Sequence, residues 1–365
     1  MKVPLVPGAS GPAKLPSAYG PAKWLPDGRH FVAGGKAVSA DGSRLVLADS
    51  LSSSMRLLLA ADGPVISLDV SPDGRRVAYF HGYPEWRLAE YSITGQRLRD
   101  LGEGSIGRWS PGGDRIVYRS RARNALLTVR ADGGDESHVD EASFAGKYSP
   151  DGKRIAVLRS VSNSLAVYPA AGGRPVILVN SSVGGYCWSS DGEWIWFDQS
   201  GRMMKVPSQG GAAMQTGREG SVFDCSPDGS VAYATENGEF QILAPDGKTL
   251  RPLLPGFTAP WAAFGNGGRV FYGVRLNRRS VAAIDTKSGA LLKDIEIELD
   301  PADMVGSISI HPDGKRMLLT TGNVRYNIAI AEGFAQPETG WRSWFRHWRI
   351  AEAPPAQAGE ERTPE

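Results

Sequence analysis

The chain has 365 residues, of which 41 are Lys or Arg and 39 are Asp or Glu, so its net charge near pH 7 is +2. This balance means that net charge alone does not indicate a polyanionic partner. We expect no nucleic-acid binding, because the basic residues are spread along the chain and form no stripe. Glycine (45 residues) and proline (25 residues) are abundant, as is typical of a protein with many turns.

The N-terminal segment, Met1 to Pro7, lacks the apolar run of a signal peptide, and no stretch of the chain reaches membrane-spanning length. As written, the sequence predicts a cytoplasmic protein. If the chain is a fragment of a larger anchored protein, the expectation changes to an extracytoplasmic location.

A four-residue turn motif recurs about every 41 residues along the chain. Its near-copies of Ser-Pro-Asp-Gly are residues 71–74, 149–152, 226–229 and, with His311 in place of serine, 311–314; weaker versions are 25–28, 110–113, 189–192 and 265–267. Proline presets φ, Asp and Ser bond nearby backbone groups, and Gly accepts positive φ. We interpret the motifs as structural turns, and we expect His311 to make the local hydrogen bond of the serine that it replaces.

Each turn is preceded by an apolar residue and followed by a β-prone run, such as Arg76 to Phe80. The period of about 41 residues is that of a four-stranded propeller blade. The sequence therefore predicts an all-β protein, a β-propeller over residues 1–334 with eight blades of four-stranded antiparallel sheet. Seven blades is the alternative, if the turn near Asp27 or the one near Asn266 does not belong to a blade.

The last repeat offers three predicted strands, at residues 307–310, 315–320 and 326–331. An incomplete blade would expose a sheet edge, which invites mispairing. The N-terminal segment from Lys2 to Val6 is β-prone, and we expect it to supply the missing strand.

The pattern apolar-Ser-Pro-Asp-Gly-x-Arg/Lys-apolar resembles the WD40-like PD40 repeat of the TolB β-propellers. Related propellers form sensor or scaffold halves of bacterial serine/threonine kinases and winged-helix regulators. The final segment, Asn327 to Phe334, is similar to the closing segment of that group. The resemblance covers residues 20–334 and implies a fold; it says little about function, because propellers host many unrelated activities.

One column of residues, two places before each turn, alternates with the apolar column and is expected on the innermost strands, near the axial channel. Its members are Lys23, Asp69, Arg108, Lys147, Cys187, Asp224, Ala263 and Ser309. We predict ligand binding by the charged members, with Arg108 and Lys147 gripping an anion and Asp69 and Asp224 orienting it; Lys23 is the third cation. The alternative is that these residues pair with one another and with water in a wet channel.

Catalytic and metal-binding motifs are poor. The five histidines, His30, His81, His138, His311 and His347, fall at unlike blade positions, so we predict no catalytic residue, no metal site and no cofactor. The two cysteines are offset by one place relative to their turns. Strand alternation would then point Cys187 and Cys225 to opposite faces, and we expect no disulfide between them.

The C-terminal segment differs in kind. Residues 335–350 are predicted to form an amphipathic helix, with Trp341, Trp344, Phe345 and Trp348 on one stripe and Arg342 and Arg346 off it. Three roles are open for this tail: docking on its own propeller, binding a partner protein, or peripheral contact with an anionic membrane. Residues 351–365 are predicted to be disordered.

These features favour a monomeric, non-catalytic interaction or sensory scaffold that binds a protein, a peptide or a small ligand on one face or at the channel mouth. One alternative is an enzyme or a hydrolase-associated propeller domain with a site in the axial channel. Another is a TolB-like periplasmic envelope protein.

Overall fold

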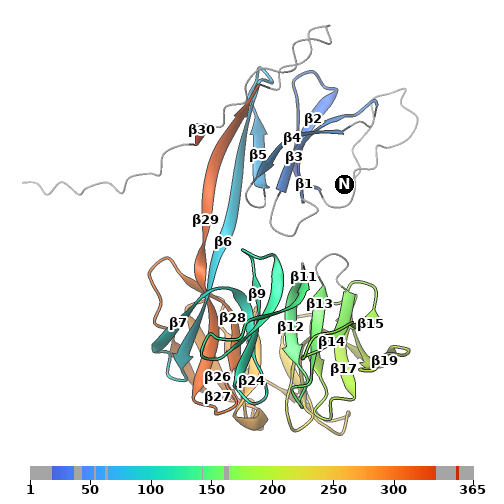
Figure 1. The fold of residues 1–365 in the computed structure, drawn as a ribbon, viewed down its shortest axis with the longest axis vertical. Helices are drawn as coiled ribbons and strands as arrows, with labels where there is room; N and C mark the ends of the chain where they lie inside the picture. The colour runs from blue at the N-terminus through green and yellow to red at the C-terminus, as the bar shows by residue number, and fades with distance from the viewer. Residues whose placement is uncertain are drawn as a thin grey trace, which may run out of the picture. The chain divides into compact units, whose positions relative to one another are not determined.

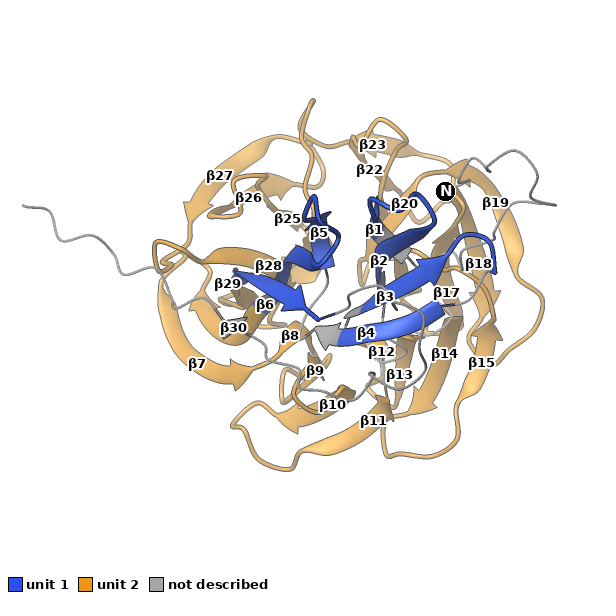
Figure 2. Cartoon of the chain, turned by 90° about the horizontal axis from the view of Figure 1, so that it is seen from above, with its two compact units in different colours: residues 1–84, 324–365 blue, residues 85–323 orange. Residues whose placement is uncertain are grey.

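The computed structural model describes residues 19–36, 43–52, 55–61, 65–141, 143–159, 164–333 and 351–352. Unit 1 comprises residues 1–84 and 324–365, and unit 2 comprises residues 85–323 (Figure 2). Two long strands, β6 (Arg76–Ser92) and β29 (Arg316–Glu332), contribute residues to both units. Among the described residues, no helix is long and apolar enough to cross a membrane.

The prediction of an all-β propeller of four-stranded antiparallel sheets is confirmed (Figure 1). In unit 2, five sheets each consist of four consecutive strands. They are β8 (Ser105–Trp109), β9 (Arg115–Ser120), β10 (Ala125–Arg130) and β11 (Ser137–Glu141); β12 (Ser143–Tyr148), β13 (Arg154–Arg159), β14 (Ser164–Pro169) and β15 (Val176–Val179); β16 (Tyr186–Trp188), β17 (Trp194–Gln199), β18 (Arg202–Pro207) and β19 (Met214–Glu219); β20 (Ser221–Cys225), β21 (Val231–Ala234), β22 (Phe240–Leu243) and β23 (Leu250–Pro252); and β24 (Ala262–Gly265), β25 (Val270–Val274), β26 (Ser280–Asp285) and β27 (Leu291–Glu296).

A sixth group of strands closes the ring of unit 2. It contains β28 (Met304–Ile310), the first part of β29, the second part of β6, and β7 (Arg97–Glu103), in that order. The first strands of the sheets contact one another in succession, with β28 against β8, β8 against β12, β16 against β20, β20 against β24, and β24 against β28. The Trp188 indole N–H donates to the Lys147 carbonyl oxygen (2.9 Å) and joins β16 to β12. Unit 2 is therefore a closed ring of six blades (Figure 2).

The repeated turns join the first and second strands of each sheet, as the turn of residues 149–152 illustrates. The Ser149 amide donates to the Arg154 carbonyl (2.8 Å), and the Ser149 hydroxyl donates to Asp151 Oδ1 (2.5 Å). Gly152 has φ +72°, a left-handed conformation that favours glycine. The structural interpretation of the motif is thus confirmed for this turn.

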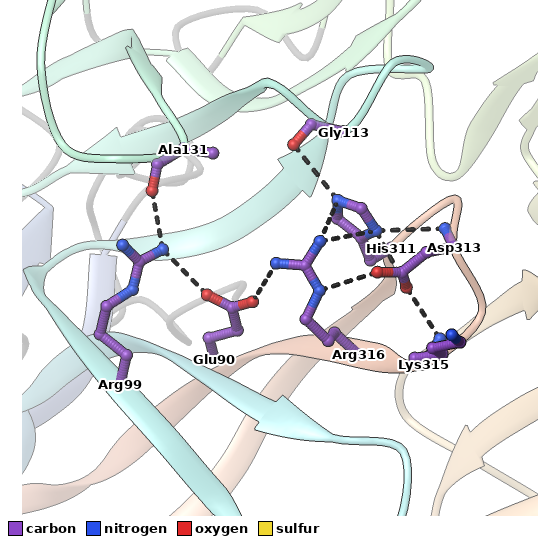
Figure 3. Close-up of polar contacts among 8 residues, drawn as sticks. All are labelled: Glu90, Arg99, Gly113, Ala131, His311, Asp313, Lys315 and Arg316. Carbon is purple, nitrogen blue, oxygen red and sulfur yellow. Dashed lines mark hydrogen bonds and ion pairs between the residues drawn. The ribbon is translucent and has the colours of Figure 1, made fainter.

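A buried glutamate holds the closing blade together (Figure 3). Glu90 of β6 accepts from Arg99 of β7 (2.9 Å) and from Arg316 of β29 (2.6 Å). His311 Nδ1 accepts from the Asp313 amide (3.1 Å), which is the local bond expected of it. Its Nε2 also lies 3.2 Å from the Gly113 carbonyl oxygen in the neighbouring blade. The contacts of Glu90 with Arg316 and of His311 with Gly113 join residues that lie about 200 positions apart in the sequence.

Unit 1 consists of two antiparallel sheets. One contains β1 (Tyr19–Trp24), β2 (His30–Lys36), β3 (Ser43–Asp49) and β4 (Met55–Ala61), and the other contains β5 (Val65–Val70), the first part of β6, the second part of β29, and β30 (Ala351–Glu352). Side chains from both sheets share one buried apolar cluster, which includes Val32, Leu45, Leu68, Tyr79 and Ala329. Unit 1 therefore has its own core.

The eight predicted repeats are all present, but they are arranged differently from one eight-bladed ring. The described strands form seven sheets, because β6 and β29 each continue from one group of strands into the next. The two last predicted strands, at residues 315–320 and 326–331, are one continuous strand, β29. Within unit 2, β6 and β7 complete the last blade; the predicted closing segment, Lys2 to Val6, lies outside the described residues.

The predicted tail helix, residues 335–350, also lies outside the described residues, together with Trp341, Trp344, Phe345, Trp348, Arg342 and Arg346. Of the segment 351–365, the structure describes Ala351 and Glu352, which pair with Ile330 and Ala329 as β30 (Figure 1).

The prediction that Cys187 and Cys225 form no disulfide is wrong. The two residues are bonded, with their Cα atoms 5.5 Å apart on the adjacent first strands β16 and β20. The prediction assumed strict alternation along both strands. In β20 the pairing register shifts between Val222 and Asp224, and such a bulge changes the face to which the following side chains point.

Candidate axial cavity

A cavity of about 260 Å³ lies inside unit 2, where the first strands of its blades meet. Its walls come from β8, β12, β16, β20 and the start of β24, with Leu158 of β13. They include the apolar side chains of Ile106, Phe144, Leu158, Val222, Phe223 and Trp261 and the polar side chains of Arg108, Lys147 and Tyr186. The inward convergence of first strands is what places Arg108 and Lys147, two residues of the predicted channel column, in one cavity.

Lys147 is held on the cavity wall by partners from β20. Its Nζ donates to the Phe223 carbonyl oxygen (2.9 Å) and to Asp224 Oδ1 (3.3 Å), and it lies 5.5 Å from the Tyr186 ring centroid. Burial lowers the pKa of Lys147 to about 8; the carboxylate of Asp224 opposes this shift, and the charge of Arg108 adds to it. Lys147 is therefore a cation whose charge the surroundings only partly compensate.

Asp224 links the cation to the next blade. Its Oδ2 accepts the Phe264 amide (3.0 Å) while its Oδ1 accepts from Lys147. These two bonds fix the carboxylate between β12 and β24, so the predicted orienting role of Asp224 is geometrically available, although its present partner is Lys147.

Arg108 has no carboxylate partner among the residues that the structure describes. One of its terminal nitrogens donates to the Ile308 carbonyl oxygen of β28, and in the described part of the chain it forms no ion pair. Burial lowers the pKa of Arg108, and the nearby charge of Asp224 opposes this effect. A guanidinium carries five N–H donors, so a partly buried Arg108 with one carbonyl partner retains donors for a further acceptor.

The remaining charged members of the predicted column lie in unit 1. Lys23 of β1 and Asp69 of β5 form an exposed ion pair at 3.4 Å, and their side chains are 55 % and 76 % exposed. Such pairs contribute little to stability. The structure thus brings Arg108, Lys147 and Asp224 together and places Lys23 with Asp69; Cys187 is in the disulfide, Ala263 is buried, and Ser309 accepts the Trp109 amide.

Asp198 is a buried residue that sequence reasoning missed. Its Oδ1 accepts the amides of Gly185 (2.8 Å) and Val222 (2.9 Å), which both line the cavity. Burial raises the pKa of Asp198, while these amide bonds work in the opposite direction. A Cβ on Gly185 would lie 1.7 Å from the Val222 carbonyl oxygen, so glycine is required there. The sequence feature that could have indicated this close packing is the glycine pair Gly184-Gly185, which directly precedes the first strand β16.

The aromatic wall was also missed. Phe144 is the second residue of β12, Trp261 directly precedes β24, and Tyr186 begins β16. Burial raises the pKa of Tyr186 strongly, so its hydroxyl stays protonated, and it donates to the Ala156 carbonyl oxygen (3.2 Å). These residues lie at the opposite ends of the first strands from the turn motif, so the repeat gave no reason to single them out.

The described histidines lie away from the cavity. His30 pairs with Asp27 in unit 1, His81 is buried there, His138 is on β11, and His311 is in the closing turn. Over the residues that the structure describes, no group of three His, Cys, Asp or Glu side chains is placed to hold a metal ion.

No protein-family model matches the chain, and no curated protein matches it in sequence. Among solved structures, a protein assigned as TolB from Agrobacterium tumefaciens matches 67 % of this chain and 99 % of its own, at 18 % identity and a TM-score of 0.50. TolB from Acinetobacter baumannii matches 82 % of each chain at 15 % identity and a TM-score of 0.47. The Cps50 (Swd1) β-propeller domain of Myceliophteria thermophila matches 82 % of this chain and 95 % of its own, at 11 % identity and a TM-score of 0.40. The chain has the fold of a TolB-like β-propeller.

Proposed function

We propose that the ring of unit 2 is a non-catalytic recognition module that binds a ligand in its axial cavity. The observation that carries this proposal is Arg108, a partly buried cation that lines the cavity and forms no ion pair in the described part of the chain. Keeping a partly buried charge without a directly bonded counter-charge is unfavourable, and a ligand that supplies the missing acceptor would reduce that cost.

The shape and chemistry of the cavity support binding over catalysis. Binding sites are concave and mostly apolar, with a few placed polar groups, and this cavity has an apolar wall and two cations. The carboxylate of Asp224 is already engaged by Lys147 and by the Phe264 amide, and Asp198 Oδ1 is engaged by the Gly185 and Val222 amides. An engaged carboxylate is poorly placed to act as a general base, because a base must reach the proton that it abstracts.

The test is a binding screen with a matched pair of variants. Thermal shift and calorimetry would be run with small acids, amines, neutral amphiphiles and short peptides. Ser221→Trp places a large side chain at an exposed position of the cavity wall, and Ser288→Trp places the same side chain at an exposed turn outside it. We expect at least one probe to bind the wild type and the Ser288→Trp variant and to lose about tenfold in affinity with Ser221→Trp.

Two results would count against the proposal. If no class of probe binds, the cavity is not a recognition site. If a probe is chemically converted by the wild type, and Lys147→Met/Asp224→Asn abolishes the conversion, the ring is an enzyme and the alternative with a site in the axial channel replaces this one.

A further inference from the structure

The two cations that line the cavity share one directly paired carboxylate. Arg108 and Lys147 are cations, and Asp224 is the carboxylate paired with Lys147 at 3.3 Å. Lys147 has three donors, of which two are used by the Phe223 carbonyl and Asp224. Arg108 uses one donor for the Ile308 carbonyl. Both cations therefore retain donors, and one further negative charge would give Arg108 the partner that Lys147 already has in Asp224.

The walls around these two cations are apolar. Ile106, Leu158 and Val222 are aliphatic, and Phe144 and Trp261 present aromatic rings. Phe144 remains 44 % exposed, although it lines the cavity, so a large apolar surface is available at its rim. An occupant that fills a cavity of about 260 Å³ must bury an apolar group as well as its charge.

We infer that the ligand is a monocarboxylate joined to an apolar group, with its carboxylate held by Arg108 and Lys147. This inference rests on the proposed function and specifies the ligand class of the same cavity. A guanidinium and an ammonium on neighbouring first strands provide charge-assisted hydrogen bonds to the two carboxylate oxygens. The aromatic and aliphatic walls receive the group attached to it.

Asp224 gives the cavity a preference among anions. Because its carboxylate is bonded to Lys147, a dianion such as a phosphate monoester would place two negative charges next to a third. Like charges at such distances repel, and the repulsion is stronger beside an apolar protein wall than in bulk water. A monocarboxylate carries half the charge of a dianion, so Asp224 repels it less. Asp224 therefore makes the cavity prefer monoanions over dianions.

The experiment measures the affinity of matched probes by calorimetry at pH 7. N-acetylphenylalanine is compared with N-acetylphenylalanine amide, which lacks the charge, and with N-acetylglycine, which lacks the apolar group. Benzoate is compared with phenyl phosphate. We expect N-acetylphenylalanine to bind at least about tenfold more tightly than its amide or N-acetylglycine, and benzoate more tightly than phenyl phosphate.

The variants test the assigned residues. Lys147→Met alone would leave Asp224 as an unpaired buried carboxylate, so the double variant Lys147→Met/Asp224→Asn is used. We expect it to weaken N-acetylphenylalanine binding about tenfold, whereas Lys153→Met, which removes an exposed lysine of a turn, leaves it unchanged. Asp224→Asn alone should improve phenyl phosphate binding more than benzoate binding.

The source of the carboxylate is decided by a further pair of probes. If a hexapeptide with a free C-terminal phenylalanine binds more tightly than N-acetylphenylalanine, a peptide C-terminus is the ligand. The reverse order identifies a small apolar acid. The inference is overturned if the amide binds as tightly as the acid, if phenyl phosphate binds as tightly as benzoate, or if the double variant binds N-acetylphenylalanine normally. If only amines or neutral probes bind, and Ser221→Trp blocks their binding, the proposal of a recognition module is supported and the inference of a carboxylate ligand is overturned.

Discussion

Lys147 is the cation whose protonation the ring itself makes unfavourable. It is 15 % exposed, faces an apolar wall and has Arg108 as a second cation nearby. The Asp224 carboxylate and the Phe223 carbonyl compensate part of this cost. Without a bound anion, the folded protein therefore binds the Lys147 proton less tightly than the unfolded chain does.

This difference predicts a pH dependence of stability. The pKa of Lys147 is about 8 in the folded ring, against an ordinary value of 10.5. Between these two values the unfolded chain binds more protons than the folded protein, so the contribution of Lys147 makes the free energy of unfolding rise as pH rises from about 8 to 10.5. Urea unfolding at pH 7.5 and pH 10 should show this rise in the wild type and a smaller one in Lys147→Met/Asp224→Asn. Equal slopes in both proteins would contradict it.

The sequence predicted part of the cavity, for a reason visible in single residues. Arg108, Lys147 and Asp224 stand two places before their turns, and strand alternation carries this spacing into the ring. Lys23 and Asp69 have the same spacing in unit 1, where they pair with each other. The position before a turn gives the face of a strand, but it does not say in which sheet assembly the strand lies.

At the scale of elements, the closing blade depends on contacts between β6 and β29. Glu90 has a side chain that is 6 % exposed and is bonded to two arginines, Arg99 and Arg316. Replacing it by Gln would remove the carboxylate that Arg99 pairs with and would leave Arg316 with the Asp313 carboxylate alone. Because both arginines are partly exposed, we expect Glu90→Gln to lower the free energy of unfolding by about 2 kcal/mol, less than for a fully buried pair.

The matched control for this prediction is the ion pair between Arg130 and Asp132, in which both side chains are more than half exposed. Arg130→Gln should change the free energy of unfolding by less than about 0.5 kcal/mol. Urea midpoints of the three proteins check both values. A Glu90→Gln protein as stable as the control would mean that β-sheet pairing alone closes the ring.

The disulfide is the second element-scale contact that stabilises the ring. It joins the first strands of two neighbouring blades, and the chain has two cysteines, both of them in this bond. We expect Cys187→Ala/Cys225→Ala to lower the free energy of unfolding by about 2–4 kcal/mol, because the bond restricts the unfolded chain. Alkylation of protein isolated from its source and unfolded without reductant should label no cysteine. Full labelling would show that the protein works in a reducing compartment with both thiols free.

The length of β6 could not be predicted from the sequence, because two of its residues are ones that usually end a strand. Gly82 and Pro84 are residues that usually interrupt a strand, and both lie inside β6. Glycine is needed at position 82 because a Cβ there would lie 2.6 Å from the Tyr326 ring of β29. The signal that reads as the end of a strand is thus a close approach between two strands that are distant in sequence.

At the scale of the whole molecule, the repeat predicts local structure better than assembly. Each turn motif lies between the first and second strands of a sheet in both units, so the period of about 41 residues correctly located the strands. The same motif occurs in the six-bladed ring and in the sheets of unit 1. What distinguishes them is the long-range pairing of β6 with β29, and a turn motif contains no information about such a partner.

The division into units predicts that residues 85–323 fold without the remainder of the chain. The buried cluster that includes Tyr91, Tyr272, Ile308 and Leu319 lies entirely within this range, and β28, β29, β6 and β7 complete the closing blade there. We expect the fragment to unfold in one cooperative transition, as a single closed core does, and to retain the carboxylate affinity of the full chain. Calorimetry of both proteins checks this.

The matched control is the fragment 76–332, which contains β6 and β29 in full. If this longer fragment folds and the shorter one does not, the ring needs pairing of β6 with β29 beyond the limits of unit 2, and the two units are not independent in stability.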